Sequence, residues 1–212
     1  MMDSAYCTLY LVRHGETEWN VEDIVLGQSD SSLTQEGIRE TEALAQALQG
    51  VAFDAIFSSD LGRAYQTAEI LGKGRGLTVE TSPLLRERNY GRFHGVSWKE
   101  LKAELKEKLE ERRKLPDAEF LSFTLDPDIE SESAVASRFI SKLKDIAATH
   151  PSKTVLVVTH GGCVRAFLAT VGYASIKRMP PGSLVNSGHV TVLSDGKDFI
   201  IKEVVGLHLE PA

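Results

Sequence analysis

Apolar positions along the chain fall into two alternating patterns. Short runs rich in valine, leucine and isoleucine are typical of buried strands, and the stretches between them carry apolar residues at helical spacing. The runs expected as strands are 6–12, 55–57, 77–79, 154–159, 190–193 and 199–201. The expected helices begin after Thr34, after Asp60, at Ser133 and after His160. This alternation predicts an α/β fold, a three-layer sandwich with a mostly parallel central sheet flanked by helices.

Residues 83–131 interrupt the alternation. Within them, apolar residues at helical spacing predict one densely charged amphipathic helix: Trp98, Leu101, Leu105 and Leu109. Pro116 and the segment 126–128 predict irregular backbone after that helix. The sequence contains no internal repeat or interdomain linker. We therefore expect a single domain over residues 1–212, with a lid-like insertion at about 83–131 over the site.

Polar triplets follow the expected strands at their carboxyl ends. In parallel sheets these ends meet at one edge, where ligands bind. We expect four segments to gather there: Arg13-His14, Ser58 to Arg63, Arg86-Glu87-Arg88 and His160-Gly161. Two histidines, several arginines and one carboxylate would then share a pocket.

Such a pocket is suited to phosphoryl transfer. Arginine stays charged and binds phosphate oxygens in a bidentate manner. An unprotonated histidine nitrogen can attack phosphorus and form a phospho-enzyme. A carboxylic acid at the mouth can protonate the leaving alkoxide. No metal is needed if arginine and histidine neutralise the phosphate.

Composition narrows the class of protein. The formal net charge of −6 argues against a general nucleic-acid binder. No window approaches the length of about 18 apolar residues that a membrane span needs, and Met1 to Ser4 do not resemble the start of a signal peptide. Two cysteines are too few for a disulfide framework, so we expect a cytoplasmic protein.

Five ordered motifs connect the chain to a known family. They are residues 11–17 (LVRHGET), 58–64 (SSDLGRA), 85–91 (LRERNYG), 132–133 (ES) and 158–162 (VTHGG). In these motifs the chain resembles the histidine phosphatase superfamily, which includes the cofactor-dependent phosphoglycerate mutases. The resemblance extends over nearly the whole chain and implies a phosphoglycerate mutase-like fold.

The resemblance also implies roles for individual residues. His14 would be the phosphorylated nucleophile and Glu87 the proton donor. The residues holding the phosphate would be Arg13, Arg63 and His160. The substrate-binding residues would be Asn20, Gly27, Arg88, Tyr90 and Gly161. No metal ligand is implied, and no cofactor, except 2,3-bisphosphoglycerate if the protein is a mutase.

The choice between phosphatase and mutase rests on departures from the mutase pattern. Mutases of this family place Asn and Ser after the second His-Gly, where this chain has Gly162 and Cys163. Their lysine in the insertion would fall at Trp98. The Arg112-Arg113 pair most simply complements a helix dipole, and its role toward substrate stays open.

We therefore expect a metal-independent phosphatase that hydrolyses small phosphomonoesters through a phosphohistidine intermediate. The alternatives are a cofactor-dependent phosphoglycerate mutase interconverting 2- and 3-phosphoglycerate, and a non-catalytic phosphate-binding module. The expected partner is a small phosphorylated metabolite rather than nucleic acid or membrane. A homodimer through an exposed edge strand near the tail is left open.

Overall fold

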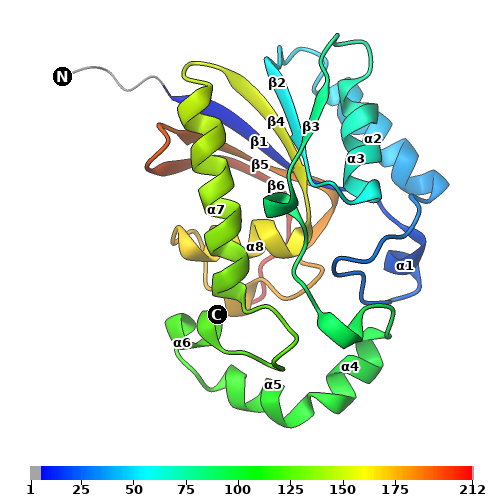
Figure 1. The fold of residues 1–212 in the computed structure, drawn as a ribbon, viewed down its shortest axis with the longest axis vertical. Coiled ribbons are helices and arrows are strands. Elements are labelled where there is room, and N and C mark those ends of the chain that lie inside the picture. Colours follow the sequence, from blue (N-terminus) through cyan, green and yellow to red (C-terminus); the bar gives the residue numbers. More distant parts are fainter. Residues whose placement is uncertain (1–5, 212) are drawn as a thin grey trace.

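A computed structural model describes residues 6–211, and its centre is a six-stranded sheet (Figure 1). The strands are β1 (Cys7–Arg13), β2 (Ala55–Ser58), β3 (Val79–Thr81), β4 (Thr154–Thr159), β5 (Leu184–Ser194) and β6 (Phe199–Leu207). Their order across the sheet is β3-β2-β4-β1-β5-β6. The first four are parallel, while β5 and β6 pair antiparallel at the other side. The sheet is thus mixed, with a parallel part that carries the predicted motifs.

Helices cover both faces of the sheet, as predicted. The longer ones are α2 (Gln35–Ala47), α3 (Gly62–Gly72), α7 (Glu132–Thr149) and α8 (Gly161–Thr170). The core between α7, α8 and the sheet is the larger one, and α2 and α3 cover the other face. The short elements are α1 (Glu18–Val21) and the 3-10 turns η1 (Pro83–Leu85), η2 (Gly91–Phe93) and η3 (Ile176–Arg178). The three-layer α/β class is confirmed.

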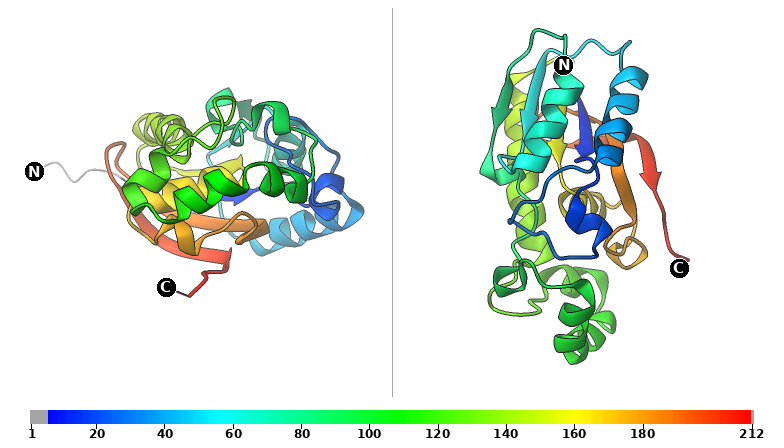
Figure 2. Two further views of the ribbon diagram at one scale, coloured as in Figure 1. Left: turned by 90° about the horizontal axis from the view of Figure 1, so that it is seen from below. Right: turned by 90° about the vertical axis from the view of Figure 1, so that its right-hand side faces the viewer.

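The inserted residues fold into a group of short helices at one end of the molecule, as both views show (Figures 1 and 2). They are α4 (Trp98–Glu104), α5 (Lys106–Arg113) and α6 (Asp117–Ser122). The prediction of one continuous helix is wrong, because α4 ends at Glu104 and α5 begins at Lys106, with Leu105 as the cap residue between them. Leu101 and Leu105 both remain buried in a small separate core, so the apolar spacing continues across the break and hides it.

Two strand predictions also need correction. The third strand is Val79–Thr81 rather than 77–79; it lies at the sheet edge, and its mostly exposed residues give no apolar signal. The C-terminal hairpin is longer than predicted, since polar residues near 186–188 belong to β5 at an irregularity between Leu184 and His189.

The expectations about membrane spans and about a signal peptide fall on different parts of the chain. Within residues 6–211, no helix has both the length and the apolar character needed to cross a membrane. The expectation for Met1 to Ser4 lies outside the described residues.

Candidate active site

The two histidines of the predicted site come from adjacent parallel strands. Arg13 on β1 is in register with Thr159 on β4, and the backbone N–H of His14 donates to the Thr159 carbonyl at 3.0 Å. His14 and His160 therefore follow paired positions at one edge of the sheet. Both are buried, and their ring centroids are 5.2 Å apart.

The hydrogen bonds of His14 assign its tautomer. Its Nδ1 lies 2.7 Å from the carbonyl oxygen of Gly15. A carbonyl only accepts, so Nδ1 carries the proton. Nε2 then carries no proton, and its lone pair accepts a hydrogen bond from Nε of Arg63 at 3.3 Å. Nε2 is the nitrogen available for attack.

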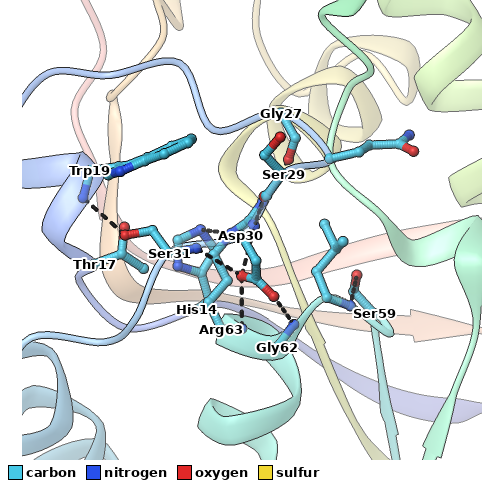
Figure 3. A network of polar contacts seen from close by, with 12 residues as sticks. His14, Thr17, Trp19, Gly27, Ser29, Asp30, Ser31, Ser59, Gly62 and Arg63 are labelled. Carbon is cyan, nitrogen blue, oxygen red and sulfur yellow. Dashed lines mark hydrogen bonds and ion pairs between the residues drawn. The ribbon is translucent and has the colours of Figure 1, made fainter. Parts of the chain in front are cut away.

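Arg63 reaches His14 from the first turn of α3, which follows β2. Its side chain is fully buried, and a loop holds its other nitrogens (Figure 3). Nη2 donates to the carbonyl of Gly27 at 2.8 Å, and Nη1 donates to the carbonyl of Ser29 at 2.7 Å. Nη1 also lies 3.2 Å from Oδ1 of Asp30. The guanidinium is thus oriented before any ligand binds.

Several buried nitrogens near His14 have no hydrogen-bond partner among the described residues. They are Nε of Arg13 and both ring nitrogens of His160. Arg13 is anchored at its far end, where Nη1 donates to the carbonyl of Leu184. Buried polar atoms normally have partners, so these nitrogens are available to a bound ligand. An oxyanion such as phosphate would accept from Nε of Arg13 and from the ring nitrogen of His160 that carries the proton.

The electrostatics of the site favour a neutral nucleophile. Burial, with the guanidiniums of Arg63 and Arg13 nearby, lowers the pKa of His14 well below its ordinary value. Burial also lowers the pKa of His160, with Arg63 and His14 adding to the effect. Burial lowers the pKa of Arg13 to about 10, so Arg13 remains charged at neutral pH. Two neutral imidazoles therefore lie beside two cations.

The Glu87 carboxylate is held at the start of α8 by two backbone N–H groups. Its Oε2 accepts from the backbone N–H of Gly162 at 3.0 Å, and its Oε1 accepts from the N–H of Arg88 at 2.7 Å. A Cβ on residue 162 would lie 2.2 Å from Oε1, so the carboxylate fills the space that glycine leaves open. Arg138 on α7 donates to the carbonyl of Glu87 at 3.0 Å and holds the loop.

A cavity of about 620 Å³ opens in front of these groups. Four of the predicted catalytic residues line it: Arg13, His14, Arg63 and Glu87. So do four of the predicted substrate-binding residues: Asn20, Gly27, Tyr90 and Gly161. His160 joins the site through its contact with the His14 ring. The volume is within the range of pockets that bind small molecules.

The structure does not bring Arg88 to this cavity. Arg88 is buried, pairs with Glu132 at 2.9 Å and donates to the carbonyl of Glu130 at 2.5 Å. Its guanidinium also lies 5.3 Å from the ring centroid of Tyr90. Arg88 therefore supports the wall of the cavity from behind.

Several polar residues of the cavity lining were not predicted as site residues from the sequence, among them Lys102, Arg165 and Asn186. Asn186 on β5 donates to the carbonyl of His14 at 3.1 Å and to Oδ1 of Asn20 at 3.2 Å, but no motif surrounds it in the sequence. Lys102 follows Trp98 by one helical turn, a spacing that could have identified it.

The Arg112-Arg113 pair divides between two roles. Arg113 lines the cavity, in addition to lying in the last turn of α5. Arg112 points elsewhere, with its guanidinium 4.3 Å from the ring centroid of Phe120.

Residues 6–211 offer no group of three or more His, Cys, Asp or Glu side chains that could hold a metal ion. The cavity is instead rich in cationic side chains: Arg13, Arg63, Lys102, Arg113 and Arg165. A donor set of this kind suits an anion.

Comparison with known proteins agrees with this geometry. The model of the histidine phosphatase superfamily (branch 1) matches residues 9–205. A probable phosphoglycerate mutase GpmB of Proteus mirabilis is 38% identical over 168 residues, which cover 77% of this chain and 74% of the relative. A metal-independent phosphoserine phosphatase of Arabidopsis thaliana is 34% identical over 205 residues, covering 92% and 80%. The crystal structure of a phosphoglycerate mutase from Bacillus anthracis is 26% identical, with a TM-score of 0.84 over 96% of this chain and 94% of that one.

Proposed function

This chain belongs to the histidine phosphatase superfamily, and we propose that it is a metal-independent phosphatase of small phosphomonoesters that works through a phosphohistidine on His14. The observation that carries the proposal is the unprotonated Nε2 of His14, which faces Arg63 Nε at 3.3 Å in a buried site. An unprotonated ring nitrogen can attack phosphorus, and the nearby guanidiniums can neutralise the charged oxygens.

The reaction takes two steps. In the first, Nε2 of His14 bonds to phosphorus as the bond to the leaving oxygen breaks, and protonated Glu87 gives its proton to that oxygen. Arg13, Arg63 and His160 hold the non-bridging oxygens. In the second, water attacks phosphorus, Glu87 takes a proton from it, and the nitrogen–phosphorus bond breaks to release orthophosphate.

The side of the cavity that the inserted helices line favours a substrate with a second anionic group. Lys102 and Arg113 line that side, are exposed, and form no ion pair with the described residues. Trp19 and Trp98 also line the cavity and add apolar surface to it. A small phosphomonoester that also carries a carboxylate fits this combination, and phosphoserine, named in the Arabidopsis relative, is of that class.

A mutase is the second candidate, because relatives named as probable phosphoglycerate mutases match a large part of the chain. Two features favour hydrolysis. The cavity of about 620 Å³ leaves room for water beside a three-carbon substrate. Gly162 seats Glu87 where the mutase pattern has asparagine, and a side chain there would meet the carboxylate.

The test is an activity screen of the purified protein with p-nitrophenyl phosphate, phosphoserine, phosphoglycerates and sugar phosphates. We expect orthophosphate release that added chelator does not change. Interconversion of 2- and 3-phosphoglycerate that depends on added bisphosphoglycerate, at a rate above hydrolysis, would replace the phosphatase by the mutase. Binding of orthophosphate without turnover of any ester would instead support a non-catalytic module.

The proposal also covers the cofactor, the cellular location, the role of the inserted residues and the oligomeric state. The protein acts without a metal or organic cofactor, a view that the metal-independent relative supports. We place it in the cytoplasm, since its two cysteines are both free and buried. Residues 83–131 act as the lid of one domain. A homodimer through β6, which is an edge strand, is to be tested by light scattering.

A further inference from the structure

Asp30 receives more hydrogen bonds than an exposed loop carboxylate usually does (Figure 3). Its Oδ2 accepts from the backbone N–H of Gly62. Its Oδ1 lies 3.2 Å from each of three nitrogens: the backbone nitrogens of Ser31 and Arg63 and Nη1 of the Arg63 side chain. One carboxylate therefore contacts the start of α3 and the catalytic guanidinium together.

This contact replaces the usual helix cap. Leu61, the N-cap residue of α3, makes no side-chain capping bond, so the carboxylate comes from a loop far earlier in the chain. A Cβ at Gly62 would lie 2.6 Å from Oδ2 of Asp30, so glycine leaves room for it. Asp30 thus sets where α3 begins relative to the loop 27–31.

We propose that Asp30 is a positioning residue for phosphoryl transfer, which acts by holding Arg63 so that its Nε faces Nε2 of His14. This inference rests on the proposed function, because the step it serves is attack by His14. Asp30 does not line the cavity and touches no reacting atom. Its effect passes through Arg63.

A capping role alone does not account for the geometry. Capping needs only the backbone N–H groups of α3, yet Oδ1 also contacts Nη1 of Arg63. The Arg63 side chain is 0% exposed, whereas that of Asp30 is 43% exposed. A partly hydrated carboxylate can neutralise a buried cation without the full desolvation penalty of a buried ion pair. Asp30 therefore offers charge and orientation together.

The test compares Asp30→Asn and Asp30→Ser with the wild type. Asn keeps the shape and loses the charge, whereas Ser keeps a hydroxyl that can still accept from the Gly62 N–H. We expect kcat with p-nitrophenyl phosphate to fall about 10- to 100-fold in both, because small misplacements of a catalytic group have effects of that size. The control is Ser131→Ala, which removes the side-chain cap of α7 (3.2 Å to the Ala134 nitrogen) and should lower only the melting temperature.

Ligand binding separates positioning from general damage. Vanadate bound by a nucleophile adopts the five-coordinate geometry of the transition state, whereas orthophosphate resembles the ground state. Binding followed by the fluorescence of Trp19 and Trp98, both at the cavity, should weaken for vanadate by the same factor as kcat. Orthophosphate binding should change by less than about threefold.

A double-mutant cycle with Arg63→Ala decides the mechanism. If Asp30 acts through Arg63, then Asp30→Asn should change vanadate affinity by less than about twofold in the Arg63→Ala background. The proposal is overturned if the effect there equals that in the wild type, or if both Asp30 variants keep kcat and vanadate affinity. If Asp30→Asn does not fold, Asp30→Ser decides. If the wild type hydrolyses no ester, the proposed function fails, and the vanadate cycle still decides the role of Asp30.

Discussion

Two parts of the cavity differ in how they are built. The strand-end cluster, which consists of Arg13, His14, Arg63 and His160, lies at the edge of the central sheet. Its histidines and Arg63 are buried, and backbone carbonyls hold Arg13, His14 and Arg63. The outer wall consists of Trp98, Lys102 and Arg113 on the inserted helices, where Lys102 and Arg113 are exposed.

The two parts also rest on different cores. The strand-end cluster stands on β1, β4 and α3, which pack into the cores of the sheet. The outer wall stands on a small separate core around Tyr90, Phe93 and Leu101. Reactive groups must keep their geometry within fractions of an ångström, so they belong on rigid elements. A wall on its own small core can change its side chains without disturbing the sheet, and this is suited to substrate selection.

The largest expected effect is on the nucleophile. His14→Ala should lower kcat at least about a thousandfold, because it removes the nitrogen that forms the phospho-enzyme. Rapid quenching at alkaline pH with labelled substrate should trap phosphate on the wild type and none on the variant. His150→Ala, at the end of α7, is the matched control and should keep full activity. A variant that still traps phosphate would assign the nucleophile elsewhere.

The next largest effect is expected at Glu87, which lines the cavity and is bonded to the first turn of α8. Glu87→Gln should lower kcat about 10²- to 10⁴-fold for phosphoserine, whose alkoxide needs a proton, and much less for p-nitrophenyl phosphate, whose leaving group does not. Gly162→Ala should also lower kcat for phosphoserine, by a smaller factor, since its Cβ displaces the Glu87 carboxylate. Equal losses with both substrates would remove Glu87 as the general acid.

A third effect is on stability and pH. In the folded chain burial lowers the pKa of His14 and His160, whereas in the unfolded chain these residues take up protons below about pH 6.5. The unfolded state therefore binds more protons there, and the free energy of unfolding should fall as pH decreases, by up to about 1.4 kcal/mol per pH unit for each histidine.

Urea denaturation between pH 7.5 and 5.5 measures the slope of the free energy of unfolding against pH. His160→Gln should reduce it, because one buried neutral group is removed. His208→Gln, at an exposed position in the tail, should leave it unchanged. An unaltered slope in His160→Gln would mean that His160 takes up a proton in the folded protein as readily as in the unfolded chain.

The smallest effect is expected at the outer wall. Lys102→Met and Arg113→Met should each lower kcat/KM for phosphoserine by no more than about fivefold, and less at high salt, because exposed charges interact weakly. Activity with p-nitrophenyl phosphate, which has no second anionic group, should not change. Lys108→Met, on α5 but outside the cavity lining, is the control. Equal losses of activity for both substrates would mean that these cations act through the general electrostatic field of the cavity rather than by selecting the substrate.

Most of the strand-end cluster could be predicted from local patterns. β1 and β4 are apolar runs that turn polar at Arg13-His14 and His160, and the rule for parallel sheets then brings them together. The bounds of the edge strand β3 and the break at Leu105 could not be predicted. β3 is mostly exposed, and the helical spacing of Leu101, Leu105 and Leu109 is the same with or without a break.

The candidate site shows the same division. Glu87 and Arg88 are neighbours in one motif, yet Glu87 faces the cavity and Arg88 pairs with Glu132 behind it. Asp30 and Asn186 are distant in sequence from the residues that they contact, and no nearby sequence pattern identifies either one.

By itself, the sequence determined the class of fold, the family and the residues at the carboxyl ends of the strands. These follow from hydrophobic periodicity and short motifs, which are local properties of the chain. Only the tertiary structure decided which nitrogen of His14 is free, where Glu87 is seated and that Asp30 holds Arg63. The contacts of Arg63 with His14 and Asp30, and that of Gly162 with Glu87, join residues distant in sequence, and their distances and burial arise only when the layers pack together.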